Sequence, residues 1–321
     1  MVRSFPPIEP YDHGMLDVGD ANLVYWETCG NPDGKPVLVV HGGPGSGCST
    51  TVRQTFDPAR FRVVLFDQRG CGRSTPHAAD PATDMRHNTT ERLLADMERL
   101  REHLRIDRWL LYGGSWGSTL ALAYAQRNPR RVSEILLVSV TTTRRAEIDW
   151  LYRGVGAFFP AEWERFCAAA PEAEGTPERL AGYARLLADP DPAVRARAAA
   201  QWAAWEDAVI SAEPNGRRNS YSNRPPDALL AMARICAHYF SNGAWLAEGA
   251  LLRDAGRLAG IPGVLIHGRL DLSGPLETAW RLAKEWPGAE LIVVEDSGHT
   301  GSEAMGAHIA AALDRLSQLI Q

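Results

Sequence analysis

The sequence has few cysteines, and their arrangement excludes two kinds of structure. Its 321 residues include five cysteines, an odd number, which are widely separated and never occur in C-x-x-C spacing. Disulfide frameworks and zinc sites use paired, closely spaced cysteines. We therefore expect neither a disulfide framework nor a metal site, and we expect the protein in a reducing compartment, the cytoplasm.

Long apolar runs and clusters of positive charge are also missing. No apolar run approaches the roughly 18 to 20 residues that a membrane helix needs. The first residues, MVRSFPPIEPYDHG, contain no apolar segment of the kind found in signal peptides. The net charge is -5 and the basic residues are dispersed, which gives no footprint for nucleic acid. We expect a small or uncharged substrate as the partner, with no membrane and no nucleic acid; these features give no oligomeric state.

The composition is that of a globular protein, with 45% hydrophobic and 23% charged residues, enough to bury a large core. Strands and helices alternate along most of it. The patterns predict strands at 23–29, 36–41, 61–67, 109–112, 135–140, 263–267 and 290–295, and helices at 89–105, 116–128, 276–285 and 303–319. Such alternation predicts an α/β fold, a mostly parallel sheet with helices on both faces.

The alternation stops between about residues 141 and 260. There Ala, Arg and Trp recur with helical periodicity, as in AVRARAAAQWAAWEDAVI. A helical insertion at this point would lie over the carboxyl ends of the strands, where open α/β sheets bind ligands. The sequence therefore predicts a core formed by residues 1–140 and 261–321, with a helical cap, residues 141–260, inserted between its two parts.

The stretch GGSWG, residues 113–117, fits the motif G-x-S-x-G at the junction of a predicted strand and a predicted helix. In this motif the chain turns so sharply that the serine is strained and side chains at the flanking positions would collide, which glycines avoid. The turn presents the hydroxyl at the positive end of the helix. A glycine-rich turn without chemistry is the alternative, but the strand-turn-helix context favours Ser115 as a nucleophile.

A serine nucleophile needs a base and an acid. His299 follows the last predicted strand and Asp271 follows the strand before it, so the order Ser, Asp, His is that of α/β hydrolases. Asp296 is a weaker candidate for the acid, because it lies in the same loop as His299. His267, at the end of a strand, is expected to be a packed or hydrogen-bonded core residue.

A tetrahedral intermediate also needs two donors for its oxyanion. We expect the backbone N–H of Trp116 to be one and that of Gly43, in HGGPGSG at residues 41–47, to be the other. This loop has neither the G-K-[ST] ending of a P-loop nor the G-x-G-x-x-G spacing, so nucleotide binding is not expected. Asp67 and Arg69, in DQRG, are expected to fix a loop through ion pairs.

Several segments together resemble the proline iminopeptidases, the prolyl aminopeptidase branch of the α/β hydrolases. They are HGGPGSG at 41, DQRGCGRS at 67, NTTERLLADMERLR at 88, GGSWGSTLALAYAQRNP at 113, GRLD at 268 and GH at 298. The resemblance covers most of the chain, and DQRGCGRS together with GGSWGSTLAL is its most specific part. It implies an α/β-hydrolase fold, a Ser115–Asp271–His299 triad, a helical cap that restricts the site to short peptides with a free N-terminus, and no metal or organic cofactor.

In that family two glutamates of the cap neutralise the N-terminal amine of the substrate. QWAAWED keeps the first as Glu206, whereas ARICAHYF places Cys236 at the second. Phe240 matches an aromatic residue of the proline-ring pocket, Thr141 stands where a phenylalanine is expected, and Gly274 replaces a cysteine. Loss of one counter-charge should leave amine recognition weaker, differently built or absent. The alternatives are a solvated charge for Glu206 and core packing for Cys236.

The leading interpretation is a serine hydrolase that releases an N-terminal, proline-type residue from short peptides or amides through an acyl-enzyme. A second interpretation keeps this machinery but gives it an ester, a lactone or an amide without a free amine. A third is a non-catalytic binding protein on a hydrolase scaffold, against which the ordered Ser, Asp and His argue.

Overall fold

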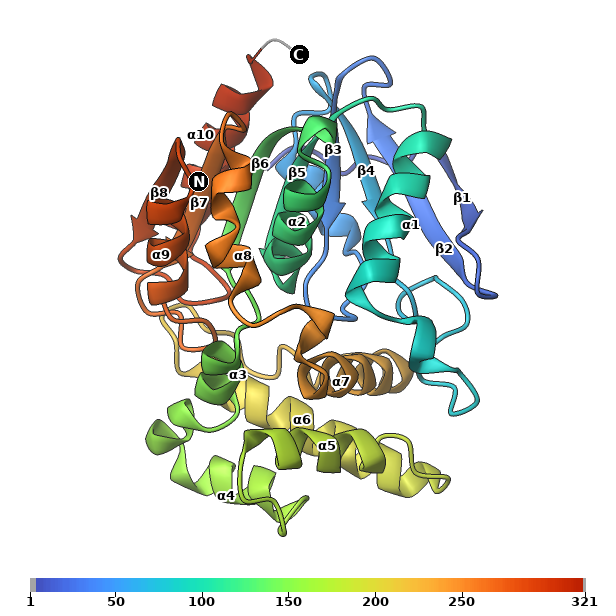
Figure 1. Ribbon diagram of the computed structural model, residues 1–321, viewed down its shortest axis with the longest axis vertical. Coiled ribbons are helices and arrows are strands. Elements are labelled where there is room, and N and C mark those ends of the chain that lie inside the picture. Colours follow the sequence, from blue (N-terminus) through green and yellow to red (C-terminus); the bar gives the residue numbers. More distant parts are fainter. Residues whose placement is uncertain (1–3, 320–321) are drawn as a thin grey trace.

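The computed structural model describes residues 4–319, and this range contains one sheet of eight strands (Figure 1). The strand order is β1-β2-β4-β3-β5-β6-β7-β8. Strands β3 to β8 are parallel, while β1 and β2 join the sheet in antiparallel pairs. The bounds are β1 (Asp12–Asp17), β2 (Leu23–Gly30), β3 (Lys35–Val40), β4 (Phe61–Phe66), β5 (Trp109–Ser115), β6 (Val132–Val140), β7 (Gly263–Gly268) and β8 (Ala289–Val294). The predicted mostly parallel sheet is confirmed.

Strands β1 and β5 differ from the sequence prediction for clear physical reasons, and β6 begins three residues before its predicted start. Strand β1 was not predicted, because it is an edge strand with exposed and half-buried residues and no buried apolar run. Strand β5 continues past residue 112, because Gly113 and Gly114 still pair with β6. Glycine has low strand propensity, so the prediction ended where the apolar residues end.

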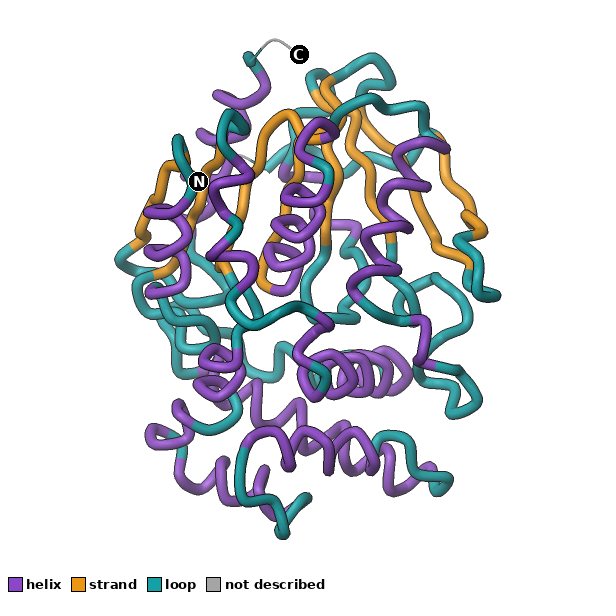
Figure 2. Tube along the Cα trace, viewed as in Figure 1, coloured by secondary structure: helices purple, strands orange, loops and turns teal. Residues whose placement is uncertain are grey.

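Helices cover both faces of the sheet (Figures 1 and 2). On one face lie α1 (Thr90–His103), α2 (Trp116–Arg127), α8 (Ala250–Arg253) and α9 (Glu277–Glu285). On the other face, α10 (Glu303–Ser317) packs with the 3₁₀ segment Thr50–Thr55 and Phe56. Because the central strands are buried on both sides, they read as nearly continuous apolar runs.

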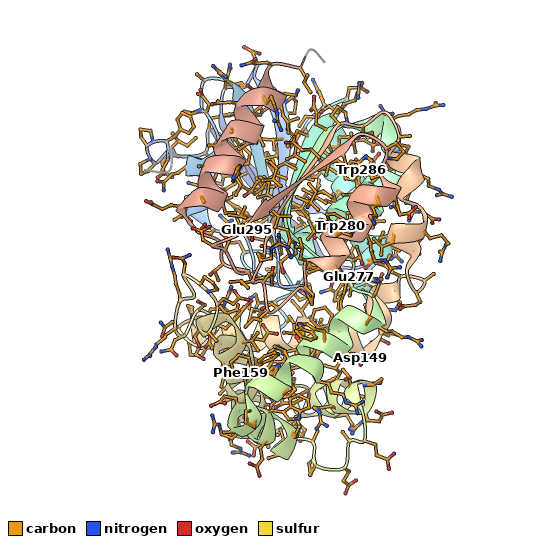
Figure 3. The ribbon with its side chains drawn as sticks, turned by 90° about the vertical axis from the view of Figure 1, so that its left-hand side faces the viewer. Asp149, Phe159, Glu277, Trp280, Trp286 and Glu295 are labelled. Atoms are coloured by element: carbon orange, nitrogen blue, oxygen red, sulfur yellow. The ribbon has the colours of Figure 1, made fainter. Side chains whose placement is uncertain are left out.

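Between Val140 and Gly263 the described chain forms helices and loops only. The helices α3 (Arg145–Leu151), α4 (Pro160–Ala168), α5 (Thr176–Leu186), α6 (Pro192–Ser211) and α7 (Pro226–Ser241) lie together beyond the carboxyl ends of the strands (Figure 1). Figure 3 shows Asp149 and Phe159 in this helical part and Trp286 in the part that contains the sheet. The helices share an aromatic core that includes Trp202 and Trp205. The division into domains at residues 140 and 260 stays a prediction.

In the described range, residues 4–319, no helix combines the length and the apolar character needed to cross a membrane.

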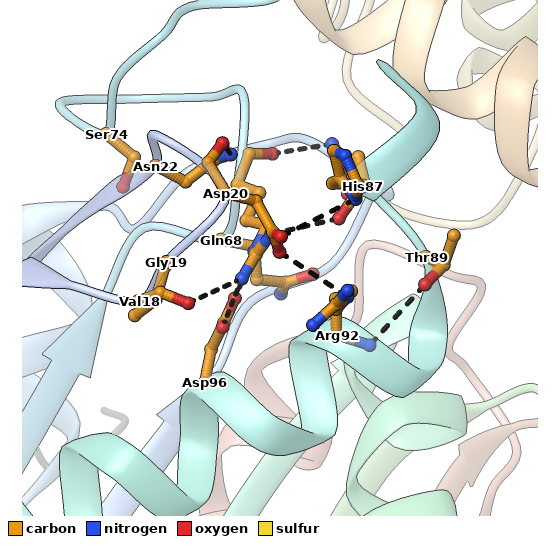
Figure 4. Close-up of polar contacts among 12 residues, drawn as sticks. Val18, Gly19, Asp20, Asn22, Gln68, Ser74, His87, Thr89, Arg92 and Asp96 are labelled. Carbon is orange, nitrogen blue, oxygen red and sulfur yellow. Dashed lines mark hydrogen bonds and ion pairs between the residues drawn. The ribbon is translucent and has the colours of Figure 1, made fainter. Parts of the chain in front are cut away.

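The DQRG segment follows β4 and fixes the surrounding loops. The buried guanidinium of Arg69 donates to both carboxylate oxygens of Asp96 on α1, at 2.6 and 2.8 Å. It also donates to Asp20 at 3.1 Å and to the carbonyl of Val18. Figure 4 shows Val18, Asp20 and Asp96 converging on this point. Arg69 therefore joins the turn after β1, the loop after β4 and helix α1, which is the loop-fixing role expected from the sequence.

We predict that Asp96→Ala lowers the free energy of unfolding by about 3 kcal/mol, because the substitution leaves a buried guanidinium without its main counter-charge. Urea unfolding followed by circular dichroism measures the loss. Asp107→Ala is the matched control, since Asp107 pairs with Arg131 at the exposed surface. That substitution should cost less than about 1 kcal/mol. Equal losses of unfolding free energy in the two variants would contradict a stabilising role for the buried Arg69–Asp96 ion pair.

Candidate active site

Ser115 lies at the sharp turn from β5 into α2, with φ 55° and ψ -126°. A non-glycine residue rarely adopts a positive φ, and such strain persists only where the surroundings impose it. A Cβ atom at Gly113 would lie 2.5 Å from the Gly117 carbonyl oxygen, and one at Gly117 would lie 2.0 Å from that of Val40. The collisions inferred from the motif are therefore present at these two glycines. A Cβ at Gly114 would meet only the carbonyl oxygen of Val138, at 3.7 Å, so that glycine is not required in the same way.

The three residues predicted as a triad lie in one hydrogen-bonded chain. His299 Nε2 is 3.0 Å from Ser115 Oγ, and His299 Nδ1 is 2.8 Å from Asp271 Oδ2. Asp271 follows β7, and its other oxygen accepts from the backbone N–H of Gly274 at 2.7 Å. Asp296 instead accepts from Ser302 on the far side of the His299 loop. The structure thus pairs His299 with Asp271 rather than with Asp296.

His267 is fully buried, as expected for a core residue. Its Nδ1 accepts from the backbone N–H of Val140, and its Nε2 donates to the carbonyl of Gly274. One ring nitrogen therefore accepts and the other donates, which is the pattern of a neutral imidazole. Burial lowers the pKa of His267, in agreement with that state. Its role is to hold the loop that carries Asp271.

The charges of the triad are strongly coupled. Burial by itself would lower the pKa of His299, but the Asp271 carboxylate, followed by Glu213 and Glu206, raises it to about 9. Burial by itself would raise the pKa of Asp271, but the charge and hydrogen bond of His299 lower it. The free site at neutral pH therefore favours an imidazolium beside a carboxylate, and the imidazole base forms at alkaline pH.

The two expected oxyanion donors, Gly43 and Trp116, line the same pocket as Ser115. The indole Nε1 of Trp116 donates to Gln68 Oε1 at 2.9 Å, and Gln68 Nε2 donates to the carbonyl of His41 at 2.9 Å. Gln68 therefore ties the start of α2 to the glycine-rich loop. The sequence interpretation missed this residue, although it lies inside DQRG, because its two bonds join segments far apart in the chain.

The pocket lies between the triad and the helices α3, α6 and α7. Apolar and polar side chains both contribute to its wall. The lining residues are Gly43, Ser115, Trp116, Thr141, Thr143, Glu147, Ile148, Leu151, Tyr152, Glu206, Ile210, Tyr221, Phe240, Ser273 and His299.

Three of the four predicted substrate-binding residues, Glu206, Phe240 and Thr141, lie in this wall. Cys236 is not among the lining residues; it is 1% exposed, and its thiol donates to the carbonyl of Pro44 at 3.3 Å. Helix α7 directs this side chain into the packed boundary between cap and glycine-rich loop. For Cys236 the structure therefore corresponds to core packing, the alternative reading, rather than to a position on the pocket wall.

Glu206 is buried, so it is not a solvated charge on the helix surface. Its Oε1 accepts from the hydroxyl of Tyr152 at 2.7 Å and from the indole of Trp202 at 2.8 Å. Burial raises the pKa of Glu206, and these two hydrogen bonds act in the opposite direction. The result is a buried carboxyl group held in a fixed orientation at the pocket wall.

Two further acidic residues near the pocket were missed by the sequence interpretation. Glu147 accepts from the backbone N–H groups of Thr142 and Thr143 and from Arg144, which fixes the loop after β6. Glu213 bonds to the backbone of the catalytic loops, including that of His299. No motif marks either residue. Within residues 4–319 no group of histidine, cysteine, aspartate and glutamate side chains has the arrangement of a metal site.

We predict different outcomes for alanine at Gly117 and at Gly114. Gly117→Ala should lower stability by about 1 to 3 kcal/mol and reduce turnover by about 100-fold, because the methyl group would displace the end of β3 and the nucleophile. Gly114→Ala, the control, should fold normally and keep most of its activity. Thermal unfolding and the rate of Ser115 labelling by a fluorophosphonate measure both effects. Similar behaviour of the two variants would contradict the steric account of the turn.

Comparison with known proteins agrees with this geometry. A family profile described as alpha/beta hydrolase fold matches residues 35–303. A protein of Streptomyces coelicolor named probable proline iminopeptidase is 52% identical over 309 residues, which cover 94% of this chain and 95% of that protein. A proline iminopeptidase of Arabidopsis thaliana is 41% identical over 319 residues, 98% of this chain and 82% of the relative.

A solved structure has the same fold at lower sequence identity. The crystal structure of a proline iminopeptidase from Mycobacterium smegmatis superposes with a TM-score of 0.60 at 19% identity, covering 95% of this chain and 99% of the other. The nearly full-length matches at 41% and 52% identity show the family of this chain. The chain belongs to the proline iminopeptidase family of α/β hydrolases.

Proposed function

We propose that this protein is a prolyl aminopeptidase, a serine hydrolase that releases an N-terminal proline from short peptides or amides through an acyl-enzyme. One observation carries the proposal. The hydrogen-bonded chain Ser115–His299–Asp271 opens on a pocket whose cap side carries the buried carboxyl group of Glu206. A nucleophile and a site for a cation thus share one small space, as release of an N-terminal residue requires.

The geometry gives each member of the triad a distinct role in the proposed reaction. His299 Nε2 takes the proton of Ser115 Oγ, and the oxygen attacks the carbonyl carbon of the first residue. The backbone N–H groups of Trp116 and Gly43 stabilise the oxyanion. His299 then returns its proton to the departing amine, so that the peptide bond breaks and an ester to Ser115 remains. Water, activated by His299, hydrolyses that ester, while Asp271 stabilises the imidazolium in both steps.

Glu206 supports recognition of the N-terminal amine. An ammonium group brought out of water needs a buried counter-charge. In the described part of the chain, both side-chain donors to Glu206 bond to Oε1, which leaves Oε2 to accept from the substrate. Because burial raises the pKa of Glu206, an incoming ammonium also favours its charged form.

A second candidate function, hydrolysis of an ester, a lactone or an amide without a free amine, has a specific observation in its favour. Cys236, at the position where the family resemblance implies a second glutamate, is buried away from the pocket wall, and Thr141 and Thr143 make part of that wall polar. Both candidates use the same triad. Only the relation of the substrate to Glu206 separates them.

The decisive experiment compares hydrolysis of the anilides of proline, alanine and N-acetylproline with hydrolysis of a simple aryl ester. Ser115→Ala is the control for each substrate and should abolish turnover without unfolding the protein. We expect the free prolyl anilide to be preferred. Preference for the ester, or indifference to acetylation, would favour the second candidate. Activity that survives in Ser115→Ala would contradict the triad itself.

We predict that Glu206→Gln reduces kcat/KM for the prolyl anilide by about 30-fold or more, because a buried ammonium would lose its counter-charge. The same variant should change hydrolysis of the aryl ester by less than about threefold, since the ester carries no amine. Steady-state kinetics with both substrates measure the difference. Equal losses would indicate a structural role for Glu206.

The raised pKa of His299 predicts the pH dependence. His299 accepts a proton only in its neutral form, so kcat/KM for the aryl ester should rise with pH and level off above about pH 9. Activity is lost as the pH falls through this pKa, because the imidazolium cannot act as a base. The ester is the substrate of choice, since it has no amine of its own to titrate. A flat profile between about pH 6 and pH 10 would contradict the coupling to Asp271.

The proposed setting of this reaction is the cytoplasm, with a small molecule or short peptide as the partner and neither nucleic acid nor a membrane. Free thiols support this proposal: all five cysteines, Cys29, Cys48, Cys71, Cys167 and Cys236, are unpaired in the described chain.

A further inference from the structure

Glu213, just beyond the end of α6, joins the cap to both catalytic loops. Its Oε2 accepts from the backbone N–H of His299 at 2.6 Å. Its Oε1 accepts from the backbone N–H of Leu272 at 2.8 Å, and the N–H of Ser273 lies 3.4 Å from the same oxygen. Leu272 directly follows Asp271, so a single carboxylate bonds to both the loop that carries Asp271 and the loop that carries His299.

We propose that Glu213 is a positioning residue of the catalytic centre, which holds the His299 loop against the Asp271 loop so that the imidazole stays aligned between Asp271 and Ser115. The proposal rests on the triad chemistry proposed above. It assigns Glu213 no contact with substrate, because Glu213 is not among the described residues that line the pocket.

The His299 loop is arranged around this carboxylate. The peptide of His299 is held on both sides: its N–H donates to Glu213, and its carbonyl accepts from Ser139 Oγ at 2.9 Å. A Cβ atom at Gly298 would lie 2.4 Å from Glu213 Oε2. Glycine before the catalytic histidine therefore makes room for the carboxylate, which gives the GH pair of the sequence a physical reason.

Because Glu213 is buried, loss of its hydrogen bonds should cost free energy. The residue is 5% exposed, and water has little access to replace a missing acceptor. A buried N–H left without a partner costs about 1 to 3 kcal/mol, and here the N–H groups belong to residues at or beside the triad. Loss of the carboxylate should therefore shift the loops rather than leave their donors unpaired.

The charge of Glu213 also affects the pKa of His299. Burial and the nearby charge of Asp271 raise the pKa of Glu213 to about 7, so the group is largely ionised under alkaline conditions. Besides Asp271, the carboxyl groups of Glu213 and Glu206 face His299 and favour its imidazolium form, and His267 lies behind Asp271. Removing the Glu213 charge therefore lowers the pKa of His299, while the contributions of the other groups remain.

Glu213→Gln tests the proposal, because the amide has nearly the same shape but turns an N–H donor toward a backbone N–H. We expect kcat to fall by about 10- to 100-fold for the prolyl anilide and the aryl ester alike. We also expect the acidic limb of kcat/KM for the ester to move to lower pH. Glu213→Asp keeps the charge but is too short to reach both loops, so its kcat should fall while its pH limb stays in place.

Glu134→Gln is the matched control. Glu134 is another buried carboxylate, bonded to Lys35 near the start of β6, at the end of that strand away from the triad. Its substitution should lower the Tm and leave both kcat and the pH limb unchanged. This variant shows what the loss of a buried carboxylate does when the catalytic loops are untouched.

Three results would overturn the proposal. The first is a folded Glu213→Gln enzyme with the kcat and pH limb of the wild type. The second is a loss confined to the prolyl anilide, which would indicate an amine contact. The third applies if Glu213→Gln does not fold: a Glu213→Asp enzyme with wild-type kcat. A wild-type protein that cleaves the ester but not the prolyl anilide would instead contradict the aminopeptidase proposal, and the ester would still test Glu213.

Discussion

The close approach of α2 to the end of β3 is the constraint on which the site depends. Gly117 lies so near the carbonyl of Val40 that no side chain fits between them. The approach accompanies the sharp turn at Ser115, where that residue has a positive φ. It also brings the start of α2 beside the loop that continues from β3, so that the expected oxyanion donors Trp116 and Gly43 come to the same pocket. One steric requirement thus places the nucleophile and the donors together.

The rest of the site consists of buried charges that depend on one another. Asp271, His299, Glu206 and Glu213 lie where the cap meets the carboxyl ends of the strands, and isolated charges there would be costly. Each is instead held by hydrogen bonds: Glu206 by Tyr152 and Trp202, and Glu213 by backbone N–H groups. The cap is therefore part of the electrostatics of the triad as well as a cover over it.

The departures from the family pattern lie in the cap and at its junction with the sheet. Thr141, at the end of β6, bonds through its hydroxyl to the carbonyl of Ser115 at 3.0 Å, which a phenylalanine could not do. Cys236 packs against the glycine-rich loop instead of facing the pocket. Neither residue belongs to the triad, so these two differences leave the hydrogen-bonded chain Ser115–His299–Asp271 in place.

Much of this protein follows from its sequence alone. The strand and helix pattern, the G-x-S-x-G turn at Ser115 and the choice of Asp271 over Asp296 rest on local periodicity, a local motif and the order of residues along the chain. Which glycines the turn requires was decided by the fold, because the collision at Gly117 is with the distant carbonyl of Val40. Strand β1 was missed because an exposed edge strand carries no apolar signal. Gln68 and Glu213 were missed because their partners are distant in sequence. The orientation of Cys236 was decided by how α7 packs on the glycine-rich loop. Periodicity and turn motifs depend on residues that are neighbours in the sequence, so the sequence predicts them. A hydrogen bond between Glu213 and His299 forms only after the folded chain has brought these residues together.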